Sequence, residues 1–307
     1  MKKSTVADST YREPGLLSKI WSNKSSYLFM LPFMIAFLIF TVISVVSAMV
    51  LSFTNFDMIQ IPKFVGLTNY IRMFLDDKIF MISVQNTLMF AFITGPFSYI
   101  SSVLIAWMVN EMGRKTRVIL TILFYAPSLT GGAMFIFTFL FSGDAYGLLN
   151  STLMQLGVLK EPINWLIDDR FNKTIVIIVQ LWAGLGAGFL ANIAGLQNVN
   201  RSMYEAAAID GISNRFQELW FITIPSIRPQ LMFSAVMTIA SSFSLGGLAA
   251  ALTGFPSANY STHTIVLHIS DVGATKMEMG YACAMATILF LFMILTRNVI
   301  AMLLKQD

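Results

Sequence analysis

Charged residues are scarce in this chain of 307 residues, since they make up 12% of it against roughly 25% in ordinary soluble domains. Hydrophobic residues make up 56%. A chain so poor in charge cannot cover itself with polar surface, which excludes an ordinary soluble domain. The apolar residues fall in blocks long enough to cross a bilayer, which needs about 20 residues as a helix. The sequence therefore predicts an integral membrane protein.

Cysteine is almost absent as well. The single residue, Cys283, lies inside an apolar block, so this chain by itself offers no disulfide framework and no cysteine-based metal cluster. We expect it to be a small packing residue. The basic residues form no long run and mostly flank the apolar blocks, so we predict a role in topology and no nucleic-acid partner.

Residues for energy conversion are missing from the sequence. It contains no Gly-x-x-x-x-Gly-Lys-Ser/Thr loop, so ATP and Mg²⁺, if used, are expected on another polypeptide. Almost no ionisable residue lies within the apolar blocks, where ion-coupled transporters need a group that changes charge. For His263 and His268, in or near the loop after the fifth block, we expect a surface or interface role. No catalytic residues and no metal site are predicted.

Six apolar blocks predict six transmembrane helices in an all-α fold. Their approximate bounds are residues 27–53, 81–110, 116–141, 174–193, 231–252 and 278–304. We interpret residues 1–26 as a polar cytoplasmic tail and residues 27–307 as one transmembrane domain. No small-residue cleavage site follows the long first block, which predicts a retained helix. Gly131-Gly132 and Gly246-Gly247 interrupt the third and fifth blocks, where they permit close helix packing or bending.

Lysine and arginine predict the orientation, because short loops rich in them remain cytoplasmic. With both termini inside, thirteen of the 20 Lys and Arg residues lie at or near the cytoplasm. The outer face receives the other seven, which are Lys63, Arg72, Lys78, Lys160, Arg170, Lys173 and Lys276. We therefore predict cytoplasmic termini. The longest outer connection, residues 142–173, contains an apolar segment at residues 148–156 that is a short surface helix with Trp165 as its interfacial anchor, or an ordinary loop.

The most informative stretch is the cytoplasmic connection at residues 200–229. It reads SMYEAAAIDG at residues 202–211 and continues ISNRFQELWFITIPSIRP to residue 229. Ser202 and Glu205 have the spacing of a capping box, which predicts a helix start there. Gly211 can take the left-handed conformation that ends a helix, and Pro225 stops a second helix at about Ile224. We expect two short helices bent at Gly211.

This stretch resembles the EAA loop of the membrane subunits of binding-protein-dependent ABC importers. The matching residues are Glu205, Ala206, Ala207, Asp210, Gly211, Phe216 or Trp220, Ile222 and Pro225. The interval from Gly211 to Pro225 is one residue longer than in the commonest form of the motif, which leaves the choice between Phe216 and Trp220 open. Helix capping alone accounts for Ser202, Glu205 and Gly211, but it does not require Asp210, the alanines and both prolines.

Further stretches resemble the carbohydrate-uptake branch of that family, in its larger first-subunit type. They are SFTNF at residues 52–56, FVGLTNY at 64–70, Asn86-Thr87, Pro127-Ser128, NWL at 164–166 and LWAGLG at 181–186. The resemblance implies the type I ABC importer permease fold in a bacterial cell membrane. It also implies a second homologous permease, two cytoplasmic ATPases that dock on the EAA loop, an extracytoplasmic solute-binding protein and a carbohydrate substrate.

Polar and aromatic residues within the apolar blocks are candidates for the substrate pathway. Sugars present hydroxyls and apolar ring faces, and polar groups are costly to leave unpaired in hydrocarbon. Each candidate has an alternative role in packing between helices or in the interfacial aromatic belt. The candidates are Asn86, Tyr99, Tyr125, Gln180, Trp182, Asn192, Ser241, Ser242 and Ser244, with Gln180 and Trp182 favoured.

A rival hypothesis is a secondary transporter or channel for a polar solute that works without ATPases. The scarcity of ionisable groups in the blocks and the EAA-like loop both argue against it. A membrane-embedded enzyme is disfavoured because no catalytic cluster is apparent.

Overall fold

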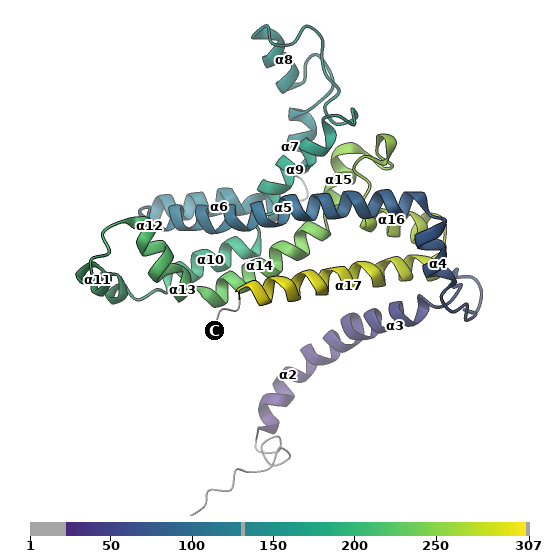
Figure 1. Cartoon of the computed structure of the whole chain (residues 1–307), viewed down its shortest axis with the longest axis horizontal. Coiled ribbons are helices and arrows are strands. Elements are labelled where there is room, and N and C mark those ends of the chain that lie inside the picture. Colours follow the sequence, from purple (N-terminus) through teal and green to yellow (C-terminus); the bar gives the residue numbers. More distant parts are fainter. Residues whose placement is uncertain (1–22, 130–132, 305–307) are drawn as a thin grey trace, which may run out of the picture. The chain divides into compact units, whose positions relative to one another are not determined.

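A computed structural model describes residues 23–129 and 133–304, and all structural statements concern these residues (Figure 1). Within them all regular elements are helices, and pairing of the β type is limited to one antiparallel bridge between Thr54 and Phe64. The chain divides into two compact units, Met1–Val50 and Leu51–Asp307. The all-helical fold class predicted from the sequence is confirmed.

The first unit holds nearly all of one long apolar span, Lys24–Leu51, of 28 residues. The span runs through α2 (Lys24–Phe37), a π-helical segment η1 (Leu38–Ile43) and α3 (Ser44–Leu51). Its apolar side chains are exposed around most of its circumference. A helix that is hydrophobic all round is stable only where its surroundings are apolar, so this span has the surface that a bilayer requires.

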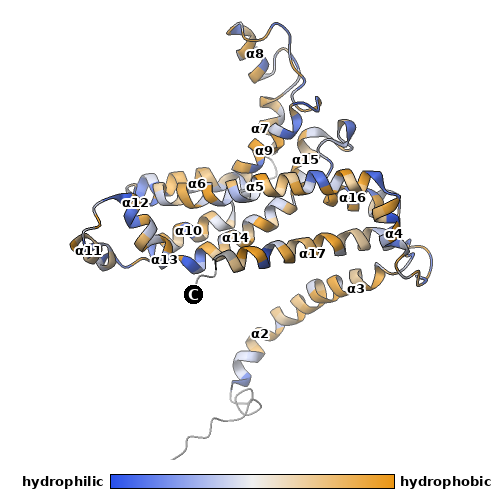
Figure 2. Cartoon of the chain, in the orientation of Figure 1, coloured by the Kyte–Doolittle hydropathy of each residue, from blue (hydrophilic) through white to orange (hydrophobic). Residues whose placement is uncertain are grey.

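The second unit is built around α5 (Lys78–Asn110), a helix of 33 residues and therefore about 50 Å long. It packs against α10 (Ala187–Gln197) and α14 (Arg228–Phe243), and these two also pack against each other. Figure 2 shows apolar residues along the bundle helices and polar ones gathered towards their ends. The remaining helices of the bundle are α4 (Thr68–Leu75), α6 (Arg114–Leu129), α7 (Ala133–Leu140), α9 (Asn172–Ala183), α15 (Gly246–Thr253), α16 (Ile265–Ser270) and α17 (Met279–Leu304).

Small residues bring the three central helices close together. The buried face of α5 carries small polar side chains at regular intervals, namely Ser83, Thr87, Thr94, Ser98 and Ser102. The backbone of α10 approaches α14 at Gly188, where an added Cβ would lie 2.7 Å from the Ser234 Oγ and 3.1 Å from its Cα. Small residues at such crossings let helix backbones pack closely in membranes.

Four helices are long and apolar enough to cross a membrane, and a bent pair makes a fifth. They are Lys24–Leu51, Lys78–Asn110, Asn172–Gln197 and Met279–Met302, with Arg228–Phe243 and Gly246–Thr253 joined at 45°. These overlap five of the six predicted spans. The predicted span at residues 116–141 is represented by α6 and α7, and Gly131-Gly132 between them lies outside the described residues. The count of six stays a prediction.

We predict that Gly188→Val lowers the stability of the bundle by about 1–3 kcal/mol, because the new side chain must displace Ser234 or push α10 away from α14. The measurement is the thermal unfolding midpoint of the purified chain in detergent. Gly247→Val is the matched control, since an added Cβ at Gly247 meets nothing within 4 Å. Equal midpoints for the two variants would contradict the proposed close packing.

Candidate functional site

The connection between α10 and α14 folds as two short helical segments, as predicted. The first is α11 (Arg201–Ile209), and its N-cap lies two residues before the predicted one. Asn200, not Ser202, is the N-cap, because the Asn200 side chain accepts the backbone N–H of Ser202 at 3.1 Å. Asparagine caps helices as well as serine does, so the capping-box prediction is wrong. Glu205 instead lies 3.7 Å from Arg201, one turn earlier.

Gly211 ends α11 in the predicted way. Its φ is +93°, in the left-handed region that favours glycine. The N–H of Ile212 donates to the carbonyl of Ala207 at 3.0 Å, and the N–H of Gly211 donates to Ala208. This pair of bonds is the Schellman motif, which satisfies the last carbonyls of a helix and reverses the chain. The bend predicted at Gly211 is confirmed.

Pro225 does not stop the second segment at Ile224, which corrects the prediction. That segment consists of α12 (Arg215–Glu218), a π-helical stretch η2 (Leu219–Thr223) and α13 (Ile224–Ser226). Pro225 therefore lies within its last turn. In η2 the N–H of Ile224 bonds back to Leu219, five residues earlier. The wider π turn gives a proline ring room that an α turn denies it, so the helical path continues for two more residues.

Contacts with α5 and between the two segments hold this loop in place. The Tyr204 hydroxyl on α11 is 2.9 Å from the Thr223 Oγ1 in η2. The ring of Phe216 packs against Trp107 near the end of α5, with centroids 5.7 Å apart. The Arg215 guanidinium lies 3.6 Å from Glu111, the residue after α5. The loop is thus bound to one end of the longest helix in the bundle.

Most of the predicted docking residues lie on the loop surface. Phe216 and Trp220 are 66% and 67% exposed, and Ile209 beside the Gly211 bend is 88% exposed. Ala207 is the exception, because it is buried. The residues predicted for docking that are exposed are Glu205, Ala206, Asp210, Gly211, Phe216, Trp220 and Pro225. Exposed apolar side chains of this size on neighbouring short helices are typical of a protein-binding surface.

The amide groups predicted in the substrate pathway bond to other helices of this chain. Asn192 is fully buried, and its Nδ2 donates to the hydroxyls of Ser102 on α5 at 3.0 Å and Ser234 on α14 at 3.1 Å. Gln180 on α9 donates to Ser241 on α14 at 3.1 Å. The bonds of Asn192 are buried between the central helices, and that of Gln180 is partly buried between α9 and α14. They give Asn192 and Gln180 a structural role.

Other pathway candidates have different surroundings. The Ser242 hydroxyl is buried and donates to the carbonyl of Thr238 on its own helix at 2.8 Å. Trp182 is partly buried and meets Phe137 edge to face, with centroids 5.3 Å apart. Tyr125, on α6, is partly buried as well. Part of the side-chain surface of Trp182 and of Tyr125 is therefore exposed.

At the other end of α5, Asn86 and Thr87 bind the loop that precedes α16. Asn86 Nδ2 donates to the carbonyls of Tyr260 and His263, each at 2.9 Å. The Thr87 hydroxyl accepts the N–H of Ile265 at 2.9 Å. His263 and His268 are both 1% exposed, so of the surface or interface role expected for them the surface alternative is wrong. The loop that carries His263 folds inward against α5, and His268 follows it in α16.

The connection of residues 142–173 contains a helix, α8 (Leu148–Gln155), where a short helix or a loop was expected. Asn150 is fully buried and organises the segment, because its Nδ2 reaches the carbonyls of Ser142, Asp144 and Ile163. Its Oδ1 accepts the Trp165 indole N–H at 2.8 Å. Trp165 thus packs within the connection.

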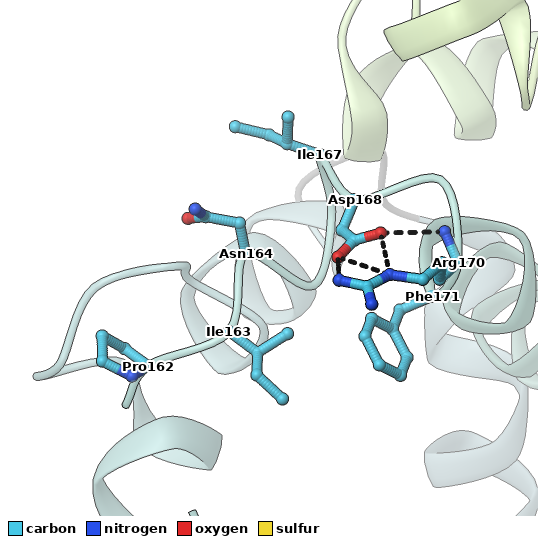
Figure 3. A pocket seen from close by; sticks show the side chains of 7 residues that line it. All are labelled: Pro162, Ile163, Asn164, Ile167, Asp168, Arg170 and Phe171. Carbon is cyan, nitrogen blue, oxygen red and sulfur yellow. Dashed lines mark hydrogen bonds and ion pairs between the residues drawn. The ribbon is translucent and has the colours of Figure 1, made fainter. Parts of the chain in front are cut away.

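A shallow pocket of about 480 Å³ lies beside this connection (Figure 3). Asp168 and Arg170 lie side by side in its lining as an ion pair with a shortest distance of 2.6 Å. The bonds from Arg170 lower the pKa of Asp168 to about 2, so the pair is ionised at neutral pH. Because the charge of Arg170 is already matched, the pocket has little attraction for an anion. Its lining residues are Pro162, Ile163, Asn164, Ile167, Asp168, Arg170 and Phe171.

Comparisons with known proteins match the chain to one family. Residues 102–306 match the family described as binding-protein-dependent transport system inner membrane component. The probable ABC transporter permease protein YesP of Bacillus subtilis is 31% identical over 87% of this chain and 86% of its own length. The arabinooligosaccharides transport system permease protein AraP of the same organism is 30% identical over 99% of this chain and 97% of its own length.

Other matches are transport proteins as well. The lactose transport system permease protein LacF of Rhizobium radiobacter is 29% identical over 74% of this chain and 75% of its own length. Among solved structures, a bacterial ABC transporter involved in the import of the acidic polysaccharide alginate superposes with a TM-score of 0.76. That match covers 95% of this chain and 99% of the other at 21% identity, which identifies the fold.

We predict that Asn192→Ala lowers the free energy of unfolding by about 1–3 kcal/mol, because the hydroxyls of Ser102 and Ser234 lose their shared donor inside the bundle. Denaturant unfolding in mixed micelles measures the loss. Asn198→Ala is the control, since Asn198 lies exposed at the end of the same helix. If both variants unfold alike, Asn192 does not bind the three helices together.

Proposed function

Because the chain belongs to the family of inner membrane components of binding-protein-dependent transport systems, we propose that it forms half of the translocation pathway of an ATP-driven importer. The multi-pass permease is itself non-catalytic. It couples through the segment from Glu205 to Gly211 to an ATPase on a separate chain. The observation that carries this proposal is the exposed EAA-like loop, which is bonded to the end of α5.

The proposed substrate is a sugar or small oligosaccharide. AraP and LacF are named for arabinooligosaccharides and lactose, which supports this class of solute. Sugars offer hydroxyls and apolar ring faces, and aromatic rings bury large apolar areas. Trp182 and Tyr125 are therefore the preferred contacts on this chain. Gln180, Asn192, Asn86 and Ser242 contribute by shaping the helices around the pathway, because each donates a hydrogen bond within the bundle.

The proposed assembly has two permeases and two cytoplasmic ATPases, which bind ATP and Mg²⁺. The sequence has no phosphate-binding loop of its own, so nucleotide must be held elsewhere. Movement of the docked ATPase would act on α11 and α12 and pass through Arg215 and Phe216 to the end of α5. Because the two segments of the loop are bonded to each other and to the end of α5, a displacement of the loop would move that helix, as in rigid-body switching transitions.

The proposed location is the bacterial cytoplasmic membrane, with both termini and the loop at residues 200–229 inside. The distribution of Lys and Arg supports this orientation. The N-terminal end of α5 then faces outward, where an extracytoplasmic solute-binding protein delivers the sugar. A solved relative in complex with alginate pentasaccharide-bound periplasmic protein superposes with a TM-score of 0.75, which supports a partner of that kind.

Co-purification tests the coupling role. We predict that Gly211→Pro reduces the ATPase recovered with the tagged chain by roughly tenfold or more, because proline cannot adopt a φ of +93°. The loop would then lose the bend that presents Glu205 and Trp220 together. The measurement is ATPase activity and subunit stoichiometry after purification from the native membrane in mild detergent.

Gly157→Pro is the matched control. Gly157 also has a positive φ, of +72°, has open space around it, and donates one backbone bond that proline removes. It lies in the connection proposed to be outside, so the ATPase should stay bound. Wild-type chain that purifies without an ATPase, yet moves solute in liposomes, would instead establish the secondary transporter or channel.

A further inference from the structure

A continuous chain of titratable side chains is buried where α5 begins. The Nε2 of His268 lies 2.9 Å from the Oδ2 of Asp77, the residue that caps α5. The Nδ1 of His268 faces the Nε2 of His263 at 3.4 Å. The Tyr281 hydroxyl, on α17, donates to the same Asp77 oxygen at 2.7 Å. Four groups from four segments of the chain thus share one line of contacts.

The chemistry of these groups assigns their protons at neutral pH. An ionised carboxylate only accepts, so His268 donates from Nε2 to Asp77 and its Nδ1 is left to accept. His263 then donates from Nε2. The Nδ1 of His263 carries the remaining lone pair, and it is buried with no hydrogen-bond partner among the described residues. With both histidines neutral, each imidazole N–H has an acceptor.

An added proton has no favourable place in this arrangement. On His263 it would create a buried N–H without an acceptor, in a ring that stacks on Phe255 with centroids 5.7 Å apart. On His268 it would point an N–H at the N–H of His263 unless that ring changes tautomer, which again leaves an N–H unpaired. Burial, followed by the neighbouring His268, lowers the pKa of His263 from 6.5 to about 4.

The other charged groups around the histidines are already paired. Arg72 of α4 binds Glu278 at 2.6 Å and lies over the ring of Tyr281. Lys276 binds Asp271 of the π-helical segment η4 (Asp271–Thr275) at 3.0 Å. Asp77 accepts from the N–H of Phe80 besides His268 and Tyr281. The charged groups that act on His263 are Asp77, Asp271 and Lys276, and Tyr260 packs on its ring. Arg72 and Glu278 act on Tyr281.

These contacts also have a mechanical consequence. Asp77 is continuous with α5, His268 belongs to α16, Tyr281 belongs to α17, and His263 lies in the loop that Asn86 binds to α5. The chain of contacts therefore closes one end of the bundle across three helices. Figure 1 shows α4 and α16 near this end of α5 and α11 to α13 near the other. The whole length of α5 separates the histidines from the loop that carries Gly211.

We propose that His263, His268, Asp77 and Tyr281 form a proton-sensitive latch, which holds α5, α16 and α17 together at neutral pH and opens when the medium outside the cell becomes acidic. The external position of the latch rests on the proposed orientation; its response to protons does not. A histidine whose pKa is lower in the closed state stabilises that state fully above about pH 6.5. The stabilisation is lost progressively as the pH falls towards 4.

Accessibility of a buried cysteine tests the latch in the assembled transporter in lipid nanodiscs. The lone Cys283 is replaced by alanine, and Thr262→Cys places a thiol in the fully buried loop between Tyr260 and His263. Ala274→Cys provides an exposed reference thiol on η4. The quantity measured is the ratio of their reaction rates with a charged, membrane-impermeant thiol reagent. Because the thiolate fraction of both cysteines falls in the same proportion as the pH is lowered, the ratio of their rates does not contain this effect.

Between pH 7.5 and pH 5 the ratio should rise roughly thirtyfold, as expected for opening linked to one group whose pKa is 6.5 in the open state and about 4 in the closed state. In the His263→Gln chain the ratio should not change with pH, because glutamine can still donate to His268 but does not titrate. In Tyr281→Phe, which removes one bond and keeps both histidines, the ratio should be higher at pH 7.5 and still rise on acidification.

An unchanged ratio in the chain that keeps His263 overturns the latch, and so does an equal rise in the His263→Gln chain. If the His263→Gln chain is already reactive at pH 7.5, it no longer serves as a comparison. The response of the chain that keeps His263 then decides alone whether the latch exists. The measurement needs neither ATP nor sugar. A chain that purifies without an ATPase, moves solute in liposomes and still shows the acid response would therefore refute the proposed import function and leave the latch standing.

Discussion

In hydrocarbon a polar side chain has no water to bind, and this constraint determines how the bundle is built. Unpaired polar groups are costly there, and most buried polar side chains on α5 bond to a neighbouring segment or to their own backbone. The hydroxyls of Thr94 and Ser98 are exceptions, because they have no hydrogen-bond partner among the described residues. Asn192 meets this need for two helices at once, because it donates to Ser102 on α5 and to Ser234 on α14. Such bonds form only at short distances, which explains why Gly188 lies where α10 meets α14.

The same close packing fixes α5 against its neighbours. Helices that interlock through small residues and hydrogen bonds cannot slide freely past one another. Arg215 and Phe216 attach the proposed ATPase-binding loop to the C-terminal end. Asn86 and Thr87 attach the loop before α16 near the N-terminal end. A single helix thus joins the two ends of the permease.

The parts of this structure that depend on local chemistry could be predicted from the sequence. Apolar length predicts most of the spans, and the bend at Gly211 follows from the freedom of glycine at positive φ. Errors arose where two local solutions compete: Asn200 caps α11 in place of Ser202, and a π turn accommodates Pro225. Asn200 and Ser202 are both chemically suited to cap a helix, and Pro225 is compatible with a helix end or with a π turn. The order of residues alone does not distinguish these alternatives.

Contacts between distant segments were beyond prediction. His263 and His268 appear in a polar loop, and nothing nearby indicates that Asp77, almost 200 positions earlier, meets them. The one local signal is Asp77 itself, placed three residues before Phe80 at the start of an apolar block, where an N-cap is expected. Burial of the histidines becomes apparent only when the loop folds back onto α5.

The two kinds of polar contact along α5 differ in what can change them. The bonds of Asn192, Ser102 and Ser234 join neutral groups, so neither proton concentration nor salt alters them within the physiological range. The contacts at the N-terminal end include Asp77 and two imidazoles, whose strength depends on a proton balance. If ATP drives transport, these groups are not needed for energy coupling. Their burial is then best understood as control over when this end of the bundle can move, because a buried histidine links helix packing to the pH of the medium.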